Sequence, residues 1–502
     1  MTDPINLANL KPRQAGILLH ISSLPSHYGV GDLGLEALRF IDLLSKMGVT
    51  VWQTLPINMP HADNSPYQCL SAHAGNPDFI SLETLEFQGL LSKEDLAASV
   101  INKSSLLIKA HQALIHQDET LMHLQLGDFC RKQAHWLDDF ALFLALRNKF
   151  NQLGWAFWPE AYKNRDETVM NLSRLELPVE IAAIKFTQFI FFSQWMSLKS
   201  YANNKGIQLF GDIPIFVAYD SADVWANPNL FKLDEAKNMT VVAGVPPDYF
   251  SETGQRWGNP HYNWEVMQSE DFSWWVSRMS TQNVLFDMVR IDHFRGLEAA
   301  WEIPEYEETA ANGYWVTAPG CSLLKAIKRS LPNITLIAED LGIITQEVEA
   351  LRESYHLPGM KILQFAFSGQ EDNPYLPHHI EVDSVVYTGT HDNNTTVGWY
   401  DSIDDYTRER VNAYIHGAHS HEHQIRMPQD LIEMALSTQA YLAIIPLQDL
   451  LALDGHHRMN TPGTASGNWG WRFEWNQLNT EQEDFLAGVI EHTGRKNTLI
   501  AI

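Results

Sequence analysis

The sequence predicts a (β/α)8 barrel, a closed ring of eight parallel strands surrounded by helices. Short apolar runs rich in valine, isoleucine and leucine recur along the chain, and each ends in polar residues or glycine, as strands buried on both faces do. Helical patterns separate several of these runs, which indicates a parallel sheet. Eight such runs are the number that closes a barrel of this class.

The expected strands lie at residues 16–20, 51–55, 208–212, 288–292, 335–339, 360–365, 384–390 and 442–447. Clear helical patterns precede the second and the fifth strand, at residues 35–47 and 323–330. Pro446 weakens the assignment of the last strand, because proline cannot donate to a strand ladder. We expect the final helix to begin at Thr480, with Glu483 three residues later completing a capping box.

Two connections are too long for simple crossovers. About 150 residues separate the second and third strands, and they carry helical patterns at 93–100, 138–150 and 180–201. We therefore expect a mainly helical insertion subdomain at 83–201. About 70 residues separate the third and fourth strands, and we expect the aromatic-rich segment 218–285 to cover the active site. The roughly 50 residues after the last strand leave no room for a C-terminal β domain, so residues 1–502 should form one catalytic barrel.

Charge and cysteine content exclude several classes of protein. The chain has 35 Lys and Arg against 61 Asp and Glu, a net charge of −26 that repels phosphate backbones and anionic lipid. Nucleic acid and membrane are therefore not expected partners. Cys69, Cys130 and Cys321 lie far apart and form no CxxC pair, which fits a reducing cytoplasm. The N-terminus lacks a signal-peptide pattern, and no apolar run approaches the roughly 20 residues that span a bilayer.

Carboxylates stand where the expected strands end. Asp212 ends the third strand, Asp292 the fourth, Glu339 and Asp340 the fifth, and Asp392 follows the seventh. Barrel active sites form at this end of the strands, and buried carboxylates are costly unless paired. The set therefore predicts a site at one rim of the barrel. For Asp212 and Asp340 taken singly, capping of the following helix is an equally good interpretation.

Two of these carboxylates have environments that suit opposite roles. Strand side chains alternate, so Arg290 and Asp292 face the same side, and the guanidinium should keep the Asp292 carboxylate ionised by lowering its pKa. Glu339 follows the apolar Ile337 and Ala338, where desolvation and a neighbouring carboxylate should raise its pKa. A nucleophile and a proton donor of this kind cleave glycosidic bonds. The alternative for Arg290 and Asp292 is a buried structural ion pair.

Aromatic side chains gather in polar, glycine-rich loops, where their flat faces match the apolar faces of sugars. They are Tyr67, Tyr249, Phe250, Trp257, Trp469 and Trp471. Packing against the barrel is the alternative for any one of them.

Other chemistries lack their motifs. The histidine clusters at 378–379, 419–423 and 456–457 show no HExxH pattern, and we expect neither a metal nor a cofactor. The chain has no G-x-S-x-G, no GxxxxGK[ST] and no GxGxxG after a strand. A barrel enzyme acting on sugar phosphates would need a glycine-rich loop near the seventh or eighth strand, where this chain has THDNNTT.

Four motifs resemble those of the 4-alpha-glucanotransferases called amylomaltases or disproportionating enzymes, glycoside hydrolase family 77. They are GDIPIFV at 211–217, VRIDHFRG at 289–296, AEDLG at 338–342 and GTHDNNT at 389–395. The resemblance extends to NSPYQ at 64–68, PPDYFSETGQRWGNP at 246–260, and MNTPG with GNWGWR between 459 and 472. One departure concerns the stretch before SPYQ, which reads His61-Ala62-Asp63 where several relatives have an aromatic residue.

The resemblance implies a retaining double displacement on α-1,4-glucans and malto-oligosaccharides. Asp292 takes the position of the nucleophile, Glu339 that of the acid/base and Asp392 that of the transition-state stabiliser. The substrate-binding residues that it implies are Tyr67, Asp212, Tyr249, Phe250, Trp257, Arg290, His293, His391, Asn460 and Pro462. An α-glucan hydrolase of amylase or α-glucosidase type is the alternative enzyme, and a non-catalytic carbohydrate-binding protein is the alternative outside enzymes.

Overall fold

The computed structural model describes residues 12–97, 101–247, 251–418, 423–464 and 466–496. Eight parallel strands form one sheet in the order β10-β11-β12-β1-β2-β3-β6-β9. They are β1 (Gln14–Leu18), β2 (Val51–Gln53), β3 (Gln208–Pro214), β6 (Met288–Asp292), β9 (Leu336–Ala338), β10 (Gly359–Ile362), β11 (Ser384–Tyr387) and β12 (Leu442–Pro446). The two edge strands meet where Ala338 N–H donates to the carbonyl of Pro358 at 2.9 Å. The predicted barrel is confirmed, and Pro446 is tolerated as the last residue of its strand.

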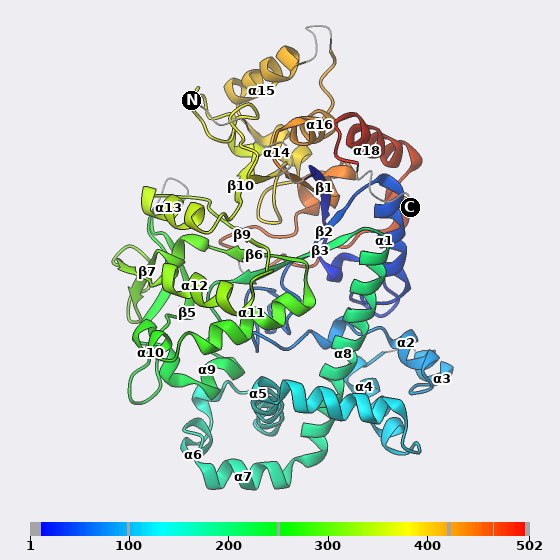
Figure 1. Ribbon diagram of the computed structural model, residues 1–502, viewed down its shortest axis with the longest axis vertical. Helices are drawn as coiled ribbons and strands as arrows, with labels where there is room; N and C mark the ends of the chain where they lie inside the picture. Colours follow the sequence, from blue (N-terminus) through cyan, green and yellow to red (C-terminus); the bar gives the residue numbers. More distant parts are fainter. Residues whose placement is uncertain (1–11, 98–100, 248–250, 419–422, 465, 497–502) are drawn as a thin grey trace.

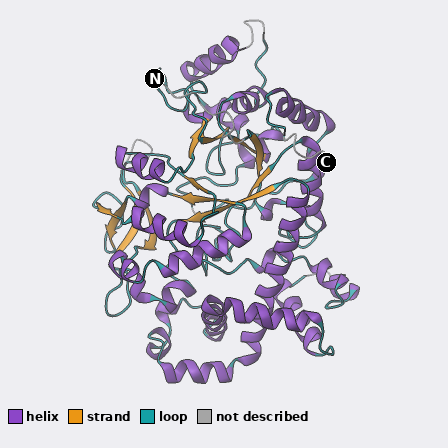
Figure 2. Cartoon of the chain, viewed as in Figure 1, coloured by secondary structure: helices purple, strands orange, loops and turns teal. Residues whose placement is uncertain are grey.

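Helices surround the barrel (Figures 1 and 2). Outside the long insertion they are α1 (Leu35–Met47), α9 (Ala222–Ala226), α10 (Trp264–Ser269), α11 (Ser273–Leu285), α12 (Gly320–Ser330), α13 (Gln346–Ser354), α14 (Thr396–Ser402), α15 (Asp405–Ala418), α16 (Gln429–Ser437), α17 (Leu447–Leu450) and α18 (Thr480–His492). The cap of α18 lies one residue earlier than predicted. Asn479 and Gln482, rather than Thr480 and Glu483, form the capping box, because the chain is still extended at Asn479.

Alternation along the strands separates an apolar barrel floor from a charged mouth. Phe210, Met288 and Ile337 point inward and pack together in the barrel interior. Two residues further along each strand, the inward positions carry Asp212, Arg290 and Glu339. The intervening residues face outward and pack against the helices. Strand geometry alone thus brings charged side chains together at the carboxyl end of the barrel.

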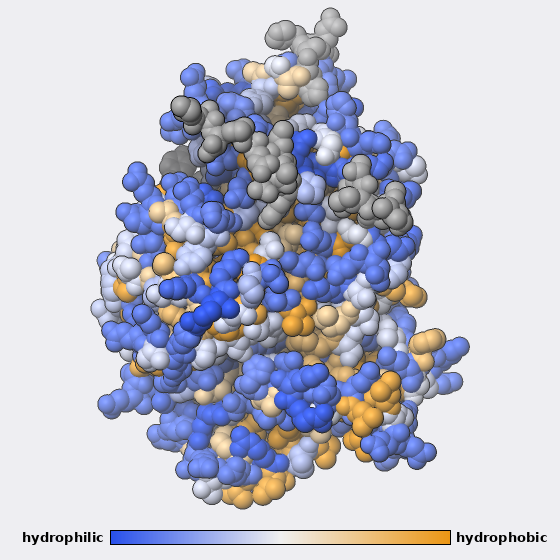
Figure 3. Space-filling model, in the orientation of Figure 1, coloured by the Kyte–Doolittle hydropathy of each residue, from blue (hydrophilic) through white to orange (hydrophobic). Residues whose placement is uncertain are grey.

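The connection between β2 and β3 is helical and extends away from the barrel, at the lower end of Figure 1. Its helices are α2 (Leu82–Phe87), α3 (Lys93–Leu96), α4 (Lys103–Ile115), α5 (Leu121–Lys149), α6 (Glu160–Lys163), α7 (Glu167–Glu176) and α8 (Pro178–Asn204). Polar side chains cover most of the face seen in Figure 3, while apolar ones gather at its lower end, over α7, where Leu172 and Leu175 are exposed. In the part of the chain that the structure describes, no helix combines the length and the apolar character needed to cross a bilayer.

A second, antiparallel sheet was not predicted. It has the order β5-β4-β7-β8 and combines two separate connections of the barrel, those after β3 and after β6. Its strands are β4 (Val241–Val245), β5 (Gln255–Pro260), β7 (Ala299–Pro304) and β8 (Tyr314–Thr317). Glycine and proline in β4, β5 and β7 hide the strand pattern in the sequence. The sheet lies beside the barrel (Figure 1) and positions Trp257, which is part of β5.

Two buried glutamines of α8 attach the helical insertion to the loop after β2. The Gln188 amide accepts a hydrogen bond from Gly75 N–H at 2.8 Å and donates to the Gly75 carbonyl at 3.0 Å. Gln194 makes the same pair of bonds with Ser81, at 2.7 and 3.0 Å. Each side chain thus satisfies the N–H and the carbonyl of one buried residue, as a neighbouring strand would.

We predict that Gln188→Leu lowers the free energy of unfolding by about 2–4 kcal/mol, because the Gly75 N–H and carbonyl lose their partners inside the protein. Denaturant unfolding measures the change. The matched control is Gln125→Leu on the exposed surface of α5, for which we expect a change within about 0.5 kcal/mol. Equal effects of the two substitutions would contradict the anchoring role of Gln188.

Candidate active site

Three of the predicted carboxylates end neighbouring strands of the barrel. Asp212 of β3 stands opposite Arg290 of β6, and Ile291 of β6 stands opposite Ala338 of β9. Asp292 and Glu339, the next residues on β6 and β9, therefore lie beside each other at the barrel mouth.

Arg290 is shared between two carboxylates. Its Nε and Nη2 donate to Asp212 Oδ1 and Oδ2 at 2.8 and 2.7 Å, and Nη2 also donates to Asp292 Oδ1 at 2.8 Å. The Asp212 carboxylate is fully buried, whereas the Asp292 side chain is 31% exposed. The guanidinium is therefore fixed by Asp212 and leaves one face of Asp292 open to the mouth.

Tyr67 connects this ion pair to the loop after β11. Its hydroxyl donates to Asp212 Oδ2 at 2.7 Å, accepts from Arg290 Nη2 at 3.1 Å and lies 2.9 Å from His391 Nε2. The Tyr67 and His391 rings stack, with centroids 5.3 Å apart. Burial raises the pKa of Tyr67 and lowers that of His391, so both side chains are neutral near neutral pH.

Glu339 is held by main-chain donors. Its Oε2 accepts from His293 N–H at 2.6 Å and its Oε1 accepts from Leu341 N–H at 3.2 Å. His293 reaches this position with a left-handed φ of 52°. Burial raises the pKa of Glu339 to about 7, with a further upward contribution from Asp340, although Arg290 and the two N–H donors oppose the shift. The raised pKa predicted from the sequence is confirmed, and it suits a proton donor near neutral pH.

The predicted direction for Asp292 is wrong, because its pKa is raised rather than lowered. Desolvation is the largest cause and outweighs the opposing charge of Arg290. The Arg290 guanidinium already serves Asp212, and the carboxylates of Asp212, Glu339 and Asp392 add to the shift. Asp292 and Glu339 consequently titrate as an interacting pair, in which ionisation of one carboxyl disfavours ionisation of the other.

Asp392 lies on the loop after β11, and the buried carboxylate of Asp449 holds both ends of this loop. Asp449 accepts hydrogen bonds from the hydroxyls of Thr388 and Thr396 at 2.6 and 2.7 Å. The Asp392 side chain is 45% exposed, and its Oδ1 accepts from the Asn460 amide at 2.6 Å. Asn460 was predicted to bind substrate, and here its amide bonds Asp392.

The remaining residues predicted to bind substrate lie in the connections around the barrel mouth or outside the described residues. The rings of Trp257 and His293 pack edge to face, with centroids 4.9 Å apart, so that Trp257 lies near Glu339. Pro462 is exposed on the loop after Asn460. Tyr249 and Phe250 lie outside the described residues.

Asp340 points away from the site. Its Oδ1 accepts from Met360 N–H at 2.7 Å, and its Oδ2 lies 3.3 Å from Arg352 Nε. The sequence leaves two interpretations open for Asp340, a cap of the following helix or a place in the site. Both are wrong, because the Asp340 carboxylate bonds the N–H of Met360 in β10 and so joins β9 to β10.

Two contributors to the site were not found from the sequence. Gln68 and Asn259 exchange amide hydrogen bonds at 3.1 and 3.3 Å, which joins the Tyr67 loop to β5. Arg458 donates to the carbonyl of Asp392. All three residues lie in or next to the quoted motifs, but a hydrogen bond between distant loops leaves no local pattern in the sequence. Among the described residues, no three His, Cys, Asp or Glu side chains are grouped to hold a metal ion.

A parallel (β/α)8 barrel whose mouth pairs an arginine-bound carboxyl with a carboxyl held by main-chain N–H groups is typical of the carboxylate-dependent enzymes that act on glycosidic bonds. Residues 19–478 match the family described as 4-alpha-glucanotransferase, glycoside hydrolase family 77. The chain belongs to this family.

Individual relatives agree with the family match. The 4-alpha-glucanotransferase of Synechocystis is 44% identical over 97% of this chain and 99% of that protein. The 4-alpha-glucanotransferase of Thermus thermophilus is 44% identical over 96% and 99%. The solved structure of amylomaltase from Streptococcus agalactiae in complex with acarbose superposes with a TM-score of 0.91 at 36% identity, covering 97% of this chain and all of that one.

We predict that Arg290→Met destabilises the fold by about 3–5 kcal/mol, because it leaves the buried Asp212 carboxylate without its cation. The double variant Arg290→Met/Asp212→Asn should recover most of this loss. Thermal or denaturant unfolding tests both. The control, Arg329→Met, removes an exposed ion pair with Asp271 and should cost less than about 1 kcal/mol. A double variant no more stable than Arg290→Met would count against the shared ion pair.

Proposed function

We propose that the protein moves α-1,4-glucan segments from donor to acceptor malto-oligosaccharides, or to glucose, by a retaining double displacement. The observation that carries this proposal is the pair Asp292 and Glu339 on neighbouring strands, one bonded to Arg290 and the other to neutral N–H donors. Family membership supports the same reaction.

In the first step an oxygen of Asp292 attacks the anomeric carbon, and the bond from that carbon to the bridging oxygen breaks. Glu339 gives its proton to the departing oxygen, so the reducing-end part of the donor leaves as a neutral alcohol while the other part stays bound to Asp292 as a glycosyl ester. The Arg290 contact favours the negative charge on Asp292, and repulsion within the pair then leaves the proton on Glu339. Asp392 stabilises positive charge at the anomeric carbon.

In the second step a hydroxyl of the acceptor glucan attacks the glycosyl ester. Glu339, now ionised, takes the hydroxyl proton, and the bond to Asp292 breaks, which restores both groups. Asp212, Arg290, Tyr67 and His391 would hold the glucosyl unit during both steps.

Transfer requires that an acceptor reach the ester before water. Trp257 is half-buried against His293, whose N–H holds Glu339, so its indole supplies an apolar surface beside the acid/base. We infer that this surface, with Tyr249, Phe250 and Pro462, covers the bound chain and excludes water. The segment 218–285 would then act as the cover, and the helices of 83–201 as an insertion subdomain.

The net charge and the cysteines bear on the cellular compartment and on the kind of partner. We infer a reducing cytoplasm because Cys69, Cys130 and Cys321 are all free thiols. The net charge of −26 supports a neutral glucan, rather than nucleic acid or an anionic membrane, as the partner.

Incubation with maltotriose tests transfer. We predict glucose together with a ladder of longer chains, read by chromatography. Glucose and maltose without any longer product would instead establish the hydrolase alternative. Asp292→Asn should abolish turnover while glucan binding persists, and turnover equal to that of the unaltered protein would reject Asp292 as the nucleophile.

The pH dependence tests the proton donor. Glu339 is protonated below its pKa of about 7, so kcat/KM for maltotriose should fall as pH rises through this value. With an α-glucosyl fluoride, whose fluoride leaves without protonation, Glu339→Gln should keep its first step and lose the alkaline decline. A kcat/KM that stays constant well above pH 7 in the unaltered protein would exclude Glu339 as the acid.

A further inference from the structure

One arginine joins the two loops that meet at Asp392. Arg458 Nη2 donates to the main-chain carbonyl of Asp392 at 2.8 Å, and its Nε donates to the carbonyl of Asn460 at 3.2 Å. The two carbonyls belong to segments 68 residues apart in sequence. A planar guanidinium can reach both at once, because its donors point in fixed directions within one plane.

Asn460 completes this junction from the opposite side. Its N–H donates to the carbonyl of His391 at 3.1 Å, and its amide donates to Asp392 Oδ1 at 2.6 Å. Three hydrogen bonds of this junction thus hold Asp392, one at the preceding peptide, one at its own carbonyl and one at its carboxylate, in addition to the bond from its N–H to the Thr390 hydroxyl at 3.3 Å. Arg458 supplies the bond to the Asp392 carbonyl and also holds Asn460, which makes the other two.

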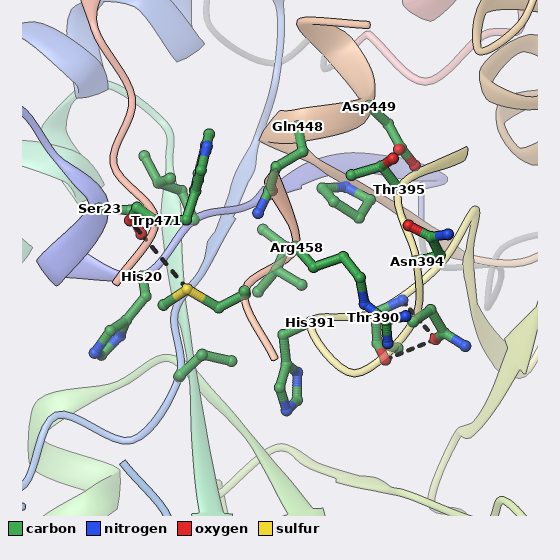
Figure 4. Close-up of a pocket in the computed structure, with 16 residues that line it drawn as sticks. His20, Ser23, Thr390, His391, Asn394, Thr395, Gln448, Asp449, Arg458 and Trp471 are labelled. Carbon is green, nitrogen blue, oxygen red and sulfur yellow. Dashed lines mark hydrogen bonds between the residues drawn. The ribbon is translucent and has the colours of Figure 1, made fainter. Parts of the chain in front are cut away.

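Arg458 lines a small cavity next to the site. Figure 4 shows the Arg458 side chain extending past His391 toward the loop of Thr390 and Asn394. The cavity has a volume of about 30 Å3, and Gln448 and Trp471 also line it, which is room for one or two water molecules. Burial lowers the pKa of Arg458, whereas the charge of Asp392 opposes this shift.

Among the described residues that line the cavity, Arg458 is the only one that carries a positive charge near neutral pH. Asp449 is occupied by Thr388 and Thr396. Burial lowers the pKa of His20, which also lines the cavity, to about 3, and burial likewise lowers that of His391. Both rings are therefore neutral near neutral pH.

We propose that Arg458 is a positioning residue for glycosyl transfer, which holds the peptide of Asp392 so that its carboxylate faces the sugar as charge develops at the anomeric carbon. This inference rests on the proposed function and on the role of Asp392 within it. Arg458 bonds the main chain of Asp392 and Asn460 and acts through these two residues.

Arg458→Ala tests this role through a split between kcat and KM. We expect kcat for maltotriose to fall about 10- to 100-fold, since small displacements of a catalytic group cost this much, while KM changes less than about threefold. Millimolar guanidinium, far below denaturing concentrations, should restore much of kcat by occupying the vacated space. Arg458→Lys, which cannot bridge both carbonyls, should recover only part of it.

The matched control is Arg408→Ala on α15. The Arg408 guanidinium also donates to main-chain carbonyls, those of Tyr400, Asp401 and Ile403, and pairs with Asp405. We expect this variant to keep its kcat and to gain nothing from guanidinium.

A double-variant comparison separates positioning from a structural effect. In an Asp392→Asn background, Arg458→Ala should lower kcat less than about threefold further, because the group that it positions is already disabled. Full multiplication of the two effects, an effect on KM alone, or no rescue by guanidinium would overturn the proposal. If Arg458→Ala does not fold, the same comparison with Arg458→Lys decides. Unaltered protein without transfer activity would refute the proposed function itself, a result distinct from all of these.

Discussion

The site depends on one guanidinium shared between two carboxylates. Asp212 is fully buried and bonds two nitrogens of Arg290, so the arginine cannot turn away without leaving a charge in the barrel interior. Its Nη2 also reaches Asp292 and the Tyr67 hydroxyl. Because β3 and β6 are paired in register, the barrel itself sets this geometry.

The same arrangement gives two similar acids different tasks. Burial raises the pKa of both Asp292 and Glu339, so burial alone does not make one an anion and the other an acid. The difference lies in their partners, a cation for Asp292 and main-chain N–H groups for Glu339. Because ionisation of one carboxyl disfavours ionisation of the other, the pair shares a single proton, and the difference in partners places this proton on Glu339.

Much of the fold and the carboxylate set could be predicted because period-two alternation and apolar runs are local signals. Spacing alone places Arg290 and Asp292 on one side of their strand, and the position of Asp212 at a strand end places it at the same rim. The direction of the Asp292 pKa could not be predicted, since it sums desolvation and charges from four strands and loops. The antiparallel sheet and the Arg458 junction combine distant segments, so neither leaves a continuous pattern in the sequence.

Neutron diffraction from crystals of the unaltered protein, grown slightly below neutral pH, tests the central claim most directly. We expect nuclear density for a deuteron on a Glu339 carboxyl oxygen and none on Asp292, with Arg290 fully deuterated between Asp212 and Asp292. A deuteron on Asp292 and a bare Glu339 carboxylate would contradict the assignment of the nucleophile and the acid.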